Sequence, residues 1–311
     1  MLKFQHRIVF MGSPEYVVPV MMSLAKYYLL CGVVTQPVRQ AGRKRAVIST
    51  PVKKLADELG IENIQPEKLS DKDFFNKLRA WDPDVVFVAA YGKIIPENLL
   101  DIPSFGFINM HASLLPRWRG ASPIQATILN GDEVSGMTII KIDKGLDTGT
   151  IISQCEVPVL PDDTLGSLRT RLFQSGTDLM LETLPEYLSG KIIPQPQIES
   201  KATYARMIKK SDGELDFNAE AAQIERKVRA YNPWPICYIK WQGNPLRIYE
   251  VVVSPTNHLS PNQKGIIERY PAIGTSTNDI QLVKVQVAGK KLIDGRQFLN
   301  GARNWPFKTR V

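Results

Sequence analysis

An unbroken run of apolar residues at positions 85–90 constrains the possible fold more than any other part of the sequence. A strand of this composition is covered on both faces, which is typical of a parallel sheet packed between helices. Further segments predicted as strands, at residues 7–12, 31–36 and 136–143, alternate with segments of helical periodicity. The sequence therefore predicts an α/β fold built on a Rossmann-like parallel sheet.

The pattern changes near residue 190. At 311 residues the chain is longer than one ordinary core, so two domains are expected. Residues 1–190 form the predicted α/β domain, and residues 191–205 form a linker with an extended, Pro-rich part at 194–197. Residues 206–311 contain short strand-like runs separated by Pro, Asn and Gly turns, which favours a small β-barrel of the OB type.

Hydroxyl residues mark two predicted helix starts. Ser13 is expected to cap a helix that has Pro14 at its first position and runs to about Leu30. Thr50 is expected to cap a second helix, which begins at Pro51.

The positive charge of the chain is unevenly distributed. The net charge is +8, with 22 basic and 22 acidic residues at positions 1–205 but 17 basic and 9 acidic residues at positions 206–311. A basic second domain indicates a polyanionic partner, and nucleic acid is favoured over a membrane surface. The alternative is a soluble domain that is basic without such a partner.

Other features of the composition indicate a cytoplasmic protein. No apolar run reaches about 18 residues, the length needed to span a membrane, and the N-terminal residues lead directly into a predicted strand rather than into a signal peptide. The three cysteines, Cys31, Cys155 and Cys237, are widely separated and have no metal-binding spacing. They are therefore expected to be reduced thiols, and no zinc site is expected.

A basic segment at residues 37–51 follows the second predicted strand. It is longer than most loops between a strand and a helix, and its four cations, Arg39, Arg43, Lys44 and Arg45, are accompanied by no acidic residue. On the ligand-binding side of the sheet, such a loop could reach a phosphate backbone. The alternative is a solvated loop with no binding role.

Two polar side chains lie where a buried strand gives way to a loop. Asn109 and His111 are two residues apart, so their side chains project to the same face of a strand. Ligands of open α/β sheets bind at the carboxyl ends of the strands. Farther along the chain, Asp147 lies between two glycines at 145 and 149, where tight turns can aim its carboxylate.

An amide, an imidazole and a carboxylate suit the attack of a neutral nucleophile on a carbonyl or formyl carbon. Asn109 can donate an N–H to the oxyanion that forms, and His111 can do the same or move the proton to the leaving nitrogen. Asp147 can orient the imidazole or accept the proton itself. Because no Ser, Cys or Lys stands out as a covalent nucleophile, direct transfer is expected. The alternative is that all three residues have structural roles.

Several separate blocks of the sequence resemble the methionyl-tRNA formyltransferase family. They are residues 10–16, the basic segment 35–43 with 50–53, residues 109–125, residues 143–149 and, in the tail, residues 228–235. The third block carries the Asn-x-His-x-Ser-Leu-Leu-Pro core of the family signature. The resemblance covers nearly the whole chain and departs from the family at Ile236, where glycine is expected.

This resemblance implies that the protein transfers the formyl group of 10-formyltetrahydrofolate to the α-amino group of methionine on initiator tRNA, for translation initiation in the cytoplasm. Residues 1–190 would be the formyltransferase catalytic domain, and residues 206–311 a basic tRNA-binding domain of the OB-like type. Folate is then a substrate, so no permanently bound cofactor and no metal are expected. The protein is expected to be a monomer.

The resemblance also implies roles for individual residues. The catalytic three of the family correspond to Asn109, His111 and Asp147. The segment that contacts folate corresponds to Ser113, Leu114, Leu115 and Pro116. Contacts with tRNA are implied for Arg39, Arg43, Lys44 and Arg45 in the basic loop.

Other interpretations stay open. Formyltransferases that act on glycinamide ribonucleotide or on an amino-sugar nucleotide share the signature core, as does a hydrolase of formyltetrahydrofolate. The basic loop, Trp118, Gln125 and the basic tail favour tRNA over these substrates. A non-catalytic RNA-binding protein would not need the amide, imidazole and carboxylate. An NAD-linked oxidoreductase would need a Gly-x-Gly-x-x-Gly turn after the first strand, where this chain has only Gly12.

Overall fold

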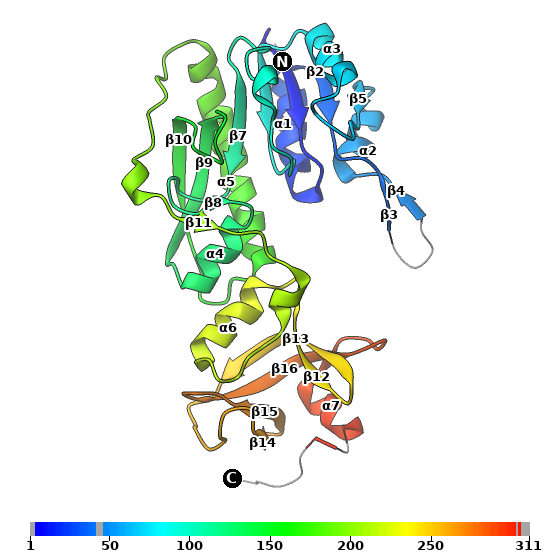
Figure 1. Ribbon diagram of the computed structural model, residues 1–311, viewed down its shortest axis with the longest axis vertical. Coiled ribbons are helices and arrows are strands. Elements are labelled where there is room, and N and C mark those ends of the chain that lie inside the picture. The colour runs from blue at the N-terminus through cyan, green and yellow to red at the C-terminus, as the bar shows by residue number, and fades with distance from the viewer. Residues whose placement is uncertain (1–3, 42–45, 303, 306–311) are drawn as a thin grey trace. The chain divides into compact units, whose positions relative to one another are not determined.

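The computed structural model describes residues 4–41, 46–302 and 304–305, with the backbone alone for residues 39–41 and 46–48 (Figure 1). The chain forms two compact units. The first consists of Met1–Pro123, Val134–Pro158 and Arg169–Ala205, and the second of Ile124–Glu133, Val159–Leu168 and Arg206–Val311. The domain boundaries expected near residues 190 and 206 stay a prediction. Among the residues described, no helix has both the length and the apolar character needed to cross a membrane.

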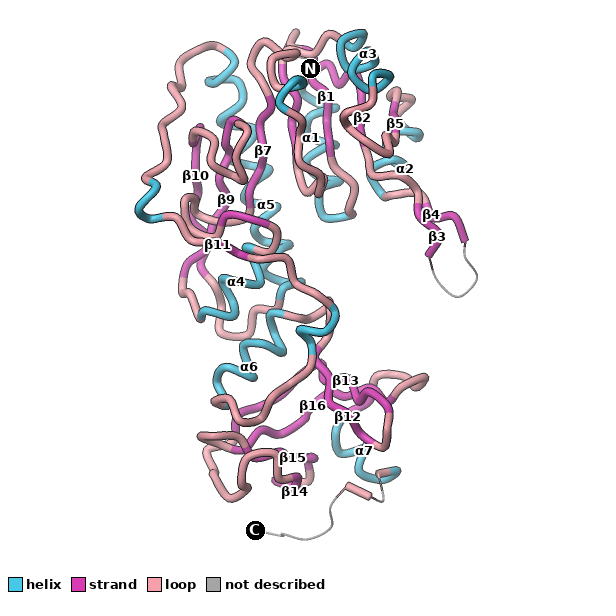
Figure 2. Tube along the Cα trace, in the orientation of Figure 1, coloured by secondary structure: helices cyan, strands magenta, loops and turns pink. Residues whose placement is uncertain are grey.

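The first unit is built around one mixed sheet (Figure 2). In the described part of the chain this sheet has seven strands, in the order β10-β9-β7-β6-β1-β2-β5. The strands are β1 (Arg7–Met11), β2 (Leu29–Val34), β5 (Asn63–Ile64), β6 (Val85–Val88), β7 (Phe107–His111), β9 (Val134–Lys141) and β10 (Ile151–Pro158). The strands from β7 to β5 are parallel, whereas β9 is antiparallel to β7 and β10 is antiparallel to β9. The predicted parallel-sheet α/β class is confirmed, with an antiparallel edge pair that the sequence pattern did not predict.

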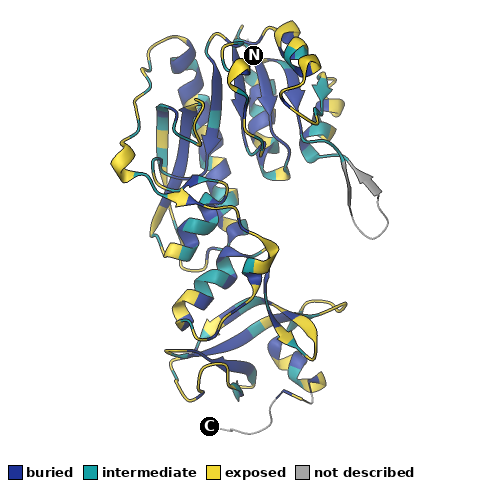
Figure 3. Cartoon of the chain, viewed as in Figure 1, coloured by how far each residue is buried: buried dark blue, intermediate teal, exposed yellow. Residues whose placement is uncertain are grey.

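Helices cover both faces of this sheet. The helical elements of the first unit before residue 190 are η1 (Glu15–Val17), α1 (Val18–Tyr27), α2 (Pro51–Glu58), α3 (Lys72–Trp81), η2 (Glu97–Leu99) and most of α5 (Leu165–Leu188). Helix α4 (Pro123–Asn130) belongs almost wholly to the second unit. On one face, Phe74 and Leu78 of α3 belong to a buried cluster with residues of β1, β2, β6 and β7. On the other face, α5 comes so close that a Cβ at Gly176 would lie 3.0 Å from the Met110 sulfur. Every residue of β6 is buried between these layers (Figure 3), which explains the apolar run at 85–90.

The expected helix start at Ser13 is wrong. The Ser13 hydroxyl oxygen instead accepts a hydrogen bond of 2.8 Å from the Gln36 backbone N–H, and this bond joins the segments that follow β1 and β2. Helix α1 begins at Val18 with Pro19 in its first turn, where the fixed φ of proline favours a helix start. The predicted helix end near Leu30 is also wrong, because Leu30 pairs with β1 as part of β2.

The second predicted cap is confirmed. The Thr50 hydroxyl oxygen accepts a hydrogen bond of 3.2 Å from the Lys53 backbone N–H, and α2 begins at Pro51. The hydroxyl groups of Thr50 and Ser13 differ in where their partners lie along the chain. Thr50 and its partner belong to one continuous segment, whereas the partner of Ser13 comes from a different strand.

The basic segment contains two short strands rather than a continuous loop. They are β3 (Arg39–Ala41) and β4 (Ala46–Ile48), which pair antiparallel. Residues 42–45 lie outside the described residues, and with them the expected tRNA contacts Arg43, Lys44 and Arg45. Arg39 is described by its backbone alone.

The second unit contains an open antiparallel sheet. Its elements after residue 205 are η4 (Lys210–Gly213), α6 (Ala221–Ala230), β12 (Cys237–Trp241), β13 (Asn244–Val253), β14 (Lys264–Ile267), β15 (Tyr270–Gly274), β16 (Asp279–Val287), β17 (Ile293–Asp294) and α7 (Gly295–Gly301). The order is β12-β13-β16-β15-β14, with β17 on β16. Within the described residues the end strands β12 and β14 do not pair, so the sheet is a half-barrel. The predicted class, a small barrel-like β domain after the α/β domain, is confirmed.

The departure from the family at Ile236 affects the backbone just before β12. Ile236 has a φ of +70°, a conformation that favours glycine and costs other residues about 1–2 kcal/mol. Its side chain is buried, and its N–H donates a hydrogen bond of 2.9 Å to the Tyr231 carbonyl oxygen. The turn that the sequence left in doubt is therefore formed with isoleucine in the conformation that glycine would adopt.

Candidate active site

Strand β7 places Asn109 and His111 on one face of the sheet. Asn109 lies opposite Val88 of β6 and Ile140 of β9, and His111 lies opposite Thr138 of β9. Because side chains alternate along a strand, both residues lie on the same face. His111 is buried, whereas Asn109 is half-buried. Within the described residues no hydrogen bond is formed by the Asn109 amide, so its N–H donors are free for a ligand.

The His111 imidazole is oriented by a backbone carbonyl. Its Nε2 lies 3.0 Å from the carbonyl oxygen of Trp118. A carbonyl oxygen only accepts hydrogen bonds, so Nε2 carries the proton. In the neutral ring, the lone pair is therefore on Nδ1. The arrangement leaves Nδ1 as the nitrogen that can accept a proton.

The carboxylate of Asp147 faces that nitrogen. Its Oδ2 lies 3.6 Å from His111 Nδ1 and accepts a hydrogen bond of 2.9 Å from the Gly120 backbone N–H. Asp147 has a φ of +54°, which glycine and, less often, aspartate adopt. This conformation turns the carboxylate of the β9–β10 loop back toward β7. An imidazolium formed at His111 would thus lie beside a fixed negative charge.

The segment 113–116 is held by strand β9. The Thr138 hydroxyl donates to the Ser113 carbonyl oxygen (2.6 Å) and accepts from the Leu115 backbone N–H (3.1 Å). The Gln154 amide nitrogen donates to the Leu115 carbonyl oxygen and to the Thr138 hydroxyl, both at 2.9 Å. The Leu115–Pro116 peptide bond is cis. The backbone of the expected folate-contacting segment is therefore fixed before any ligand arrives.

The four side chains of this segment differ in accessibility. Ser113 and Leu115 are buried, and the Ser113 hydroxyl donates a hydrogen bond of 2.6 Å to the Arg117 carbonyl oxygen. Leu114 and Pro116 are half-buried. A ligand on this segment would thus meet Leu114, Pro116 and the backbone rather than the serine hydroxyl.

Sequence reasoning did not single out Thr138, Gln154 or Gln197. These residues hold the backbone of the candidate site in place through hydrogen bonds. A hydroxyl in an otherwise apolar run was a usable signal for Thr138. Gln197, by contrast, belongs to the segment expected to be a linker. Its amide nitrogen donates to the carbonyl oxygens of Asp147 and Gly149, both at 2.7 Å.

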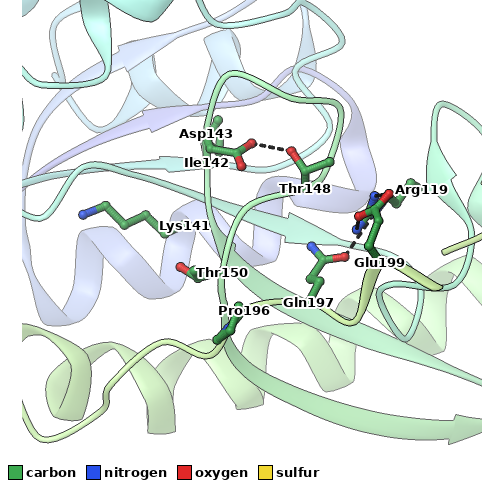
Figure 4. Close-up of a pocket in the computed structure, with 9 residues that line it drawn as sticks. All are labelled: Arg119, Lys141, Ile142, Asp143, Thr148, Thr150, Pro196, Gln197 and Glu199. Carbon is green, nitrogen blue, oxygen red and sulfur yellow. Dashed lines mark hydrogen bonds and ion pairs between the residues drawn. The ribbon is translucent and has the colours of Figure 1, made fainter. Parts of the chain in front are cut away.

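A cavity of about 360 Å³ lies beside residues 143–149, here called the Asp147 loop, which lie between β9 and β10 (Figure 4). It is lined by Arg119, Lys141, Ile142, Asp143, Thr148, Thr150, Pro196, Gln197 and Glu199. Most of its charged groups are already engaged: Asp143 accepts from the Thr148 hydroxyl (2.6 Å), and Arg119 binds Glu199. The Arg119 hydrogen bonds hold the pKa of the Glu199 carboxyl below its ordinary value. In the described part of the chain, no cluster of three or more His, Cys, Asp or Glu side chains has a metal-binding arrangement.

The comparisons with known proteins agree with this architecture. A family model described as "Formyl transferase" matches residues 6–184, and one described as "Formyl transferase, C-terminal domain" matches residues 207–303. A sugar 3N-formyltransferase solved with dTDP and 5-N-formyl-THF has a TM-score of 0.65 at 18% identity, covering 93% of this chain and all of that one. A methionyl-tRNA formyltransferase from Clostridium thermocellum has a TM-score of 0.57 at 16% identity, with 93% and 100% covered. The fold and site thus define a formyltransferase.

Curated relatives narrow this class. The methionyl-tRNA formyltransferase of Chloroflexus aggregans is 42% identical over 300 residues, which is 95% of this chain and 97% of that protein. The methionyl-tRNA formyltransferase of Macrococcus caseolyticus is 36% identical over 303 residues, 96% of each chain. The chain therefore belongs to the methionyl-tRNA formyltransferase family, and the predicted resemblance is confirmed.

The support of the 113–116 segment by Thr138 can be tested. Thr138→Val keeps the side-chain volume but leaves the Leu115 N–H and the Ser113 carbonyl without their hydroxyl partner. We expect the free energy of unfolding to fall by about 1–3 kcal/mol, measured by urea denaturation. Thr177→Val is the control, since the buried Thr177 hydroxyl donates only to the Phe173 carbonyl of its own helix. Equal losses in the two variants would contradict the assigned role.

Proposed function

We propose that this protein transfers the formyl group of 10-formyltetrahydrofolate to the α-amino group of methionine on initiator tRNA. The product is formylmethionyl-tRNA for translation initiation. One observation carries the proposal: the unengaged Asn109 amide and the His111 imidazole lie on the same face of β7, with the Asp147 carboxylate 3.6 Å from His111 Nδ1. The relatives named methionyl-tRNA formyltransferase support the choice of tRNA as acceptor.

In the proposed reaction the neutral amine attacks the formyl carbon. A C–N bond forms to the methionine nitrogen, and the formyl oxygen becomes an oxyanion. Asn109 donates an N–H to that oxygen, and interactions of this kind stabilise a transition state more than a ground state. The tetrahedral intermediate then carries a proton on the attacking nitrogen that must reach the leaving nitrogen.

His111 moves this proton. Because the Trp118 carbonyl holds the ring proton on Nε2, Nδ1 accepts the proton of the attacking amine and becomes N–H. Asp147, 3.6 Å away, stabilises the resulting imidazolium. Nδ1 then gives the proton to N10 of the folate as the formyl C–N10 bond breaks. Tetrahydrofolate leaves with N10 as a neutral amine, and no covalent enzyme intermediate is formed.

The two substrates contact different parts of the chain in this proposal. Ser113, Leu114, Leu115 and Pro116 form the folate-contacting segment, with the apolar Leu114 and Pro116 accessible to the ligand. The phosphate backbone of tRNA is bound by the basic loop with Arg39, Arg43, Lys44 and Arg45. The excess of 17 basic over 9 acidic residues at positions 206–311 supports a second tRNA-binding surface in the C-terminal domain.

The proposal also includes the oligomeric state, the cofactor use and the cellular location of the protein. Every group assigned to the chemistry comes from one chain, so we propose a monomer. Folate enters and leaves as a substrate, so the proposed mechanism uses no permanently bound cofactor. The place of action is the cytoplasm, where initiator tRNA is charged and used.

Formyl transfer can be tested directly. Purified protein incubated with Met-tRNA and 10-formyltetrahydrofolate should yield formylmethionyl-tRNA, separated and counted after mild hydrolysis of the ester bond. Free methionine should be a poor acceptor, because the tRNA contributes most of the binding contacts. A dTDP-linked amino sugar and glycinamide ribonucleotide serve as acceptor controls. Product from either control at the rate seen with Met-tRNA, or no product from Met-tRNA, would contradict the proposal.

The catalytic roles predict large losses of turnover. Asn109→Ala and His111→Ala should each lower kcat by about 100- to 1000-fold, because each removes a group that acts on the reacting atoms. The KM for 10-formyltetrahydrofolate should change little. Matched controls are Asn130→Ala and His258→Ala, which remove the same groups from exposed positions. A loss confined to folate affinity would show that these residues bind the substrate without catalysing the reaction.

The basic loop predicts a salt-dependent effect on tRNA alone. Arg43→Ala should raise the KM for Met-tRNA and leave folate binding unchanged. The slope of log affinity against log salt concentration should fall by about 1, as expected when one phosphate contact is lost. Lys72→Ala is the control, since Lys72 is an exposed cation outside the loop. An unchanged slope in Arg43→Ala would remove the loop from the tRNA-binding surface.

A further inference from the structure

The segment expected to be a linker is hydrogen-bonded to segments that surround the candidate active site. Its residues 195–205, here called the strap, include η3 (Glu199–Lys201) and the strand β11 (Tyr204–Ala205). Strand β11 pairs in parallel with β8 (Arg119–Gly120). At the other end, the backbone N–H and carbonyl of Gln195 bond to Ile151, at 2.8 and 2.7 Å. The strap therefore connects the loop that follows β7 with the beginning of β10.

Gln197 is the strap residue that reaches the Asp147 loop. Its amide nitrogen donates to the carbonyl oxygens of Asp147 and Gly149, both at 2.7 Å. Its amide oxygen accepts from Arg119 Nε at 3.1 Å, the bond that Figure 4 shows. A glutamine amide has two N–H donors and one carbonyl oxygen. Both donors and the oxygen of Gln197 are therefore in use.

Arg119 determines which way this amide points. Its side chain is fully buried, and its two terminal nitrogens bind the Glu199 carboxylate at 3.0 and 2.9 Å. A guanidinium carries donors only, in a rigid planar fork. Since the fork is held by Glu199, its Nε–H points at Gln197, which must present the amide oxygen. The NH₂ group is then directed at the Asp147 loop.

The Asp147 loop, residues 143–149, forms few other hydrogen bonds with the rest of the described chain. In the part of the chain that is described, the hydrogen bonds that join residues 143–149 to other segments come from Gln197 and from the Gly120 N–H. Asp143 bonds within the loop, to the Gly145 N–H and the Thr148 hydroxyl. The cavity of about 360 Å³ lies along this loop, so close packing does not hold it on that side. Packing holds the end of the loop at Gly149, which is buried against the Lys141 carbonyl oxygen, and these hydrogen bonds hold Asp147.

We propose that Gln197 is a positioning residue for formyl transfer, which holds the Asp147 carboxylate against His111 Nδ1, and that Arg119 orients its amide. The proposal rests on the proposed function, because it acts on the proton carrier of that reaction. Without the two bonds from Gln197, the Asp147 backbone is free to leave its φ of +54°. The carboxylate would then lie beside the imidazolium for only part of the time.

The test compares variants of equal side-chain length. Gln197→Met removes both donors and the acceptor without adding a charge. Gln197→Glu replaces the donors by a carboxylate oxygen and adds a negative charge, and Gln195→Met is the control. The Gln195 side chain is exposed, and within the described residues its hydrogen bond goes to the Ile193 carbonyl, two positions earlier. Groups that orient a catalytic residue from behind are worth about 10- to 100-fold in activity. We expect both Gln197 variants to lose kcat by such a factor, with the KM for folate and for Met-tRNA within about twofold of wild type.

A double-mutant cycle separates positioning from general stability. If Gln197 acts through Asp147, Gln197→Met should cost little further kcat in the Asp147→Asn background. Multiplicative losses would overturn the proposal, since they indicate an independent structural effect. The melting temperature is recorded for each variant. If Gln197→Met does not fold, the cycle is run with Gln197→Glu, which keeps the acceptor for Arg119.

The outcomes for the two proposals can be told apart. Absence of formyl transfer in the wild-type protein would contradict the proposed function. An active wild type, with Gln197→Met and Gln197→Glu as active as Gln195→Met, would overturn the role of Gln197 and leave the proposed function intact.

Discussion

The hydrogen bond between His111 Nε2 and the Trp118 carbonyl oxygen is the constraint on which the candidate site depends. It sets the tautomer of the imidazole, and the tautomer decides that Nδ1 is the nitrogen available for a proton. The carbonyl is held in turn by its own surroundings: Trp118 has a φ of +59°, and its N–H donates to the Thr203 hydroxyl at 2.9 Å. The chemistry of one side chain thus depends on how a loop and the strap fit together.

Two separate supports meet at this imidazole. On one side, strand β9 holds the 113–116 segment through the Thr138 hydroxyl, so the proposed folate contacts and the imidazole belong to one rigid block. On the other side, the Asp147 loop is attached by Gln197 and by the Gly120 N–H. The first support lies within a sheet and resists movement. The second is a set of hydrogen bonds beside a cavity, and it is the place where small changes would alter the geometry first.

The comparison with other formyltransferases separates the shared fold from the features that suit one acceptor. The solved sugar N-formyltransferase and methionyl-tRNA formyltransferase with similar folds share less than 20% identity with this chain, so the fold tolerates wide sequence change. In the proposed mechanism, formyl transfer uses an oxyanion donor and a proton carrier at the end of β7. The acceptor is chosen by what is added around that site. In this chain the additions are a basic hairpin segment and a basic half-barrel domain, which suit a polyanionic acceptor.

The sequence by itself determined the features that depend on local periodicity and composition. The apolar run at 85–90 predicted a sheet covered on both faces, and the two-residue spacing of Asn109 and His111 predicted that both lie on one face of β7. The uneven charge along the chain could be counted directly. Such features survive folding because each is a property of one continuous segment. The Thr50 cap was predictable for the same reason.

Only the tertiary structure decided which distant segments meet. The bond between Ser13 and the Gln36 N–H and the approach of Gln197 to Asp147 join residues 23 and 50 positions apart, and the Trp118 carbonyl meets His111 across a loop of the chain. Every residue has a backbone carbonyl and nearly every one an N–H, so no residue type marks which of them will meet a given side chain. Pairing of β1 with β2 brings Ser13 to Gln36, and packing of the strap brings Gln197 to Asp147, so the geometry of the candidate site follows from tertiary contacts.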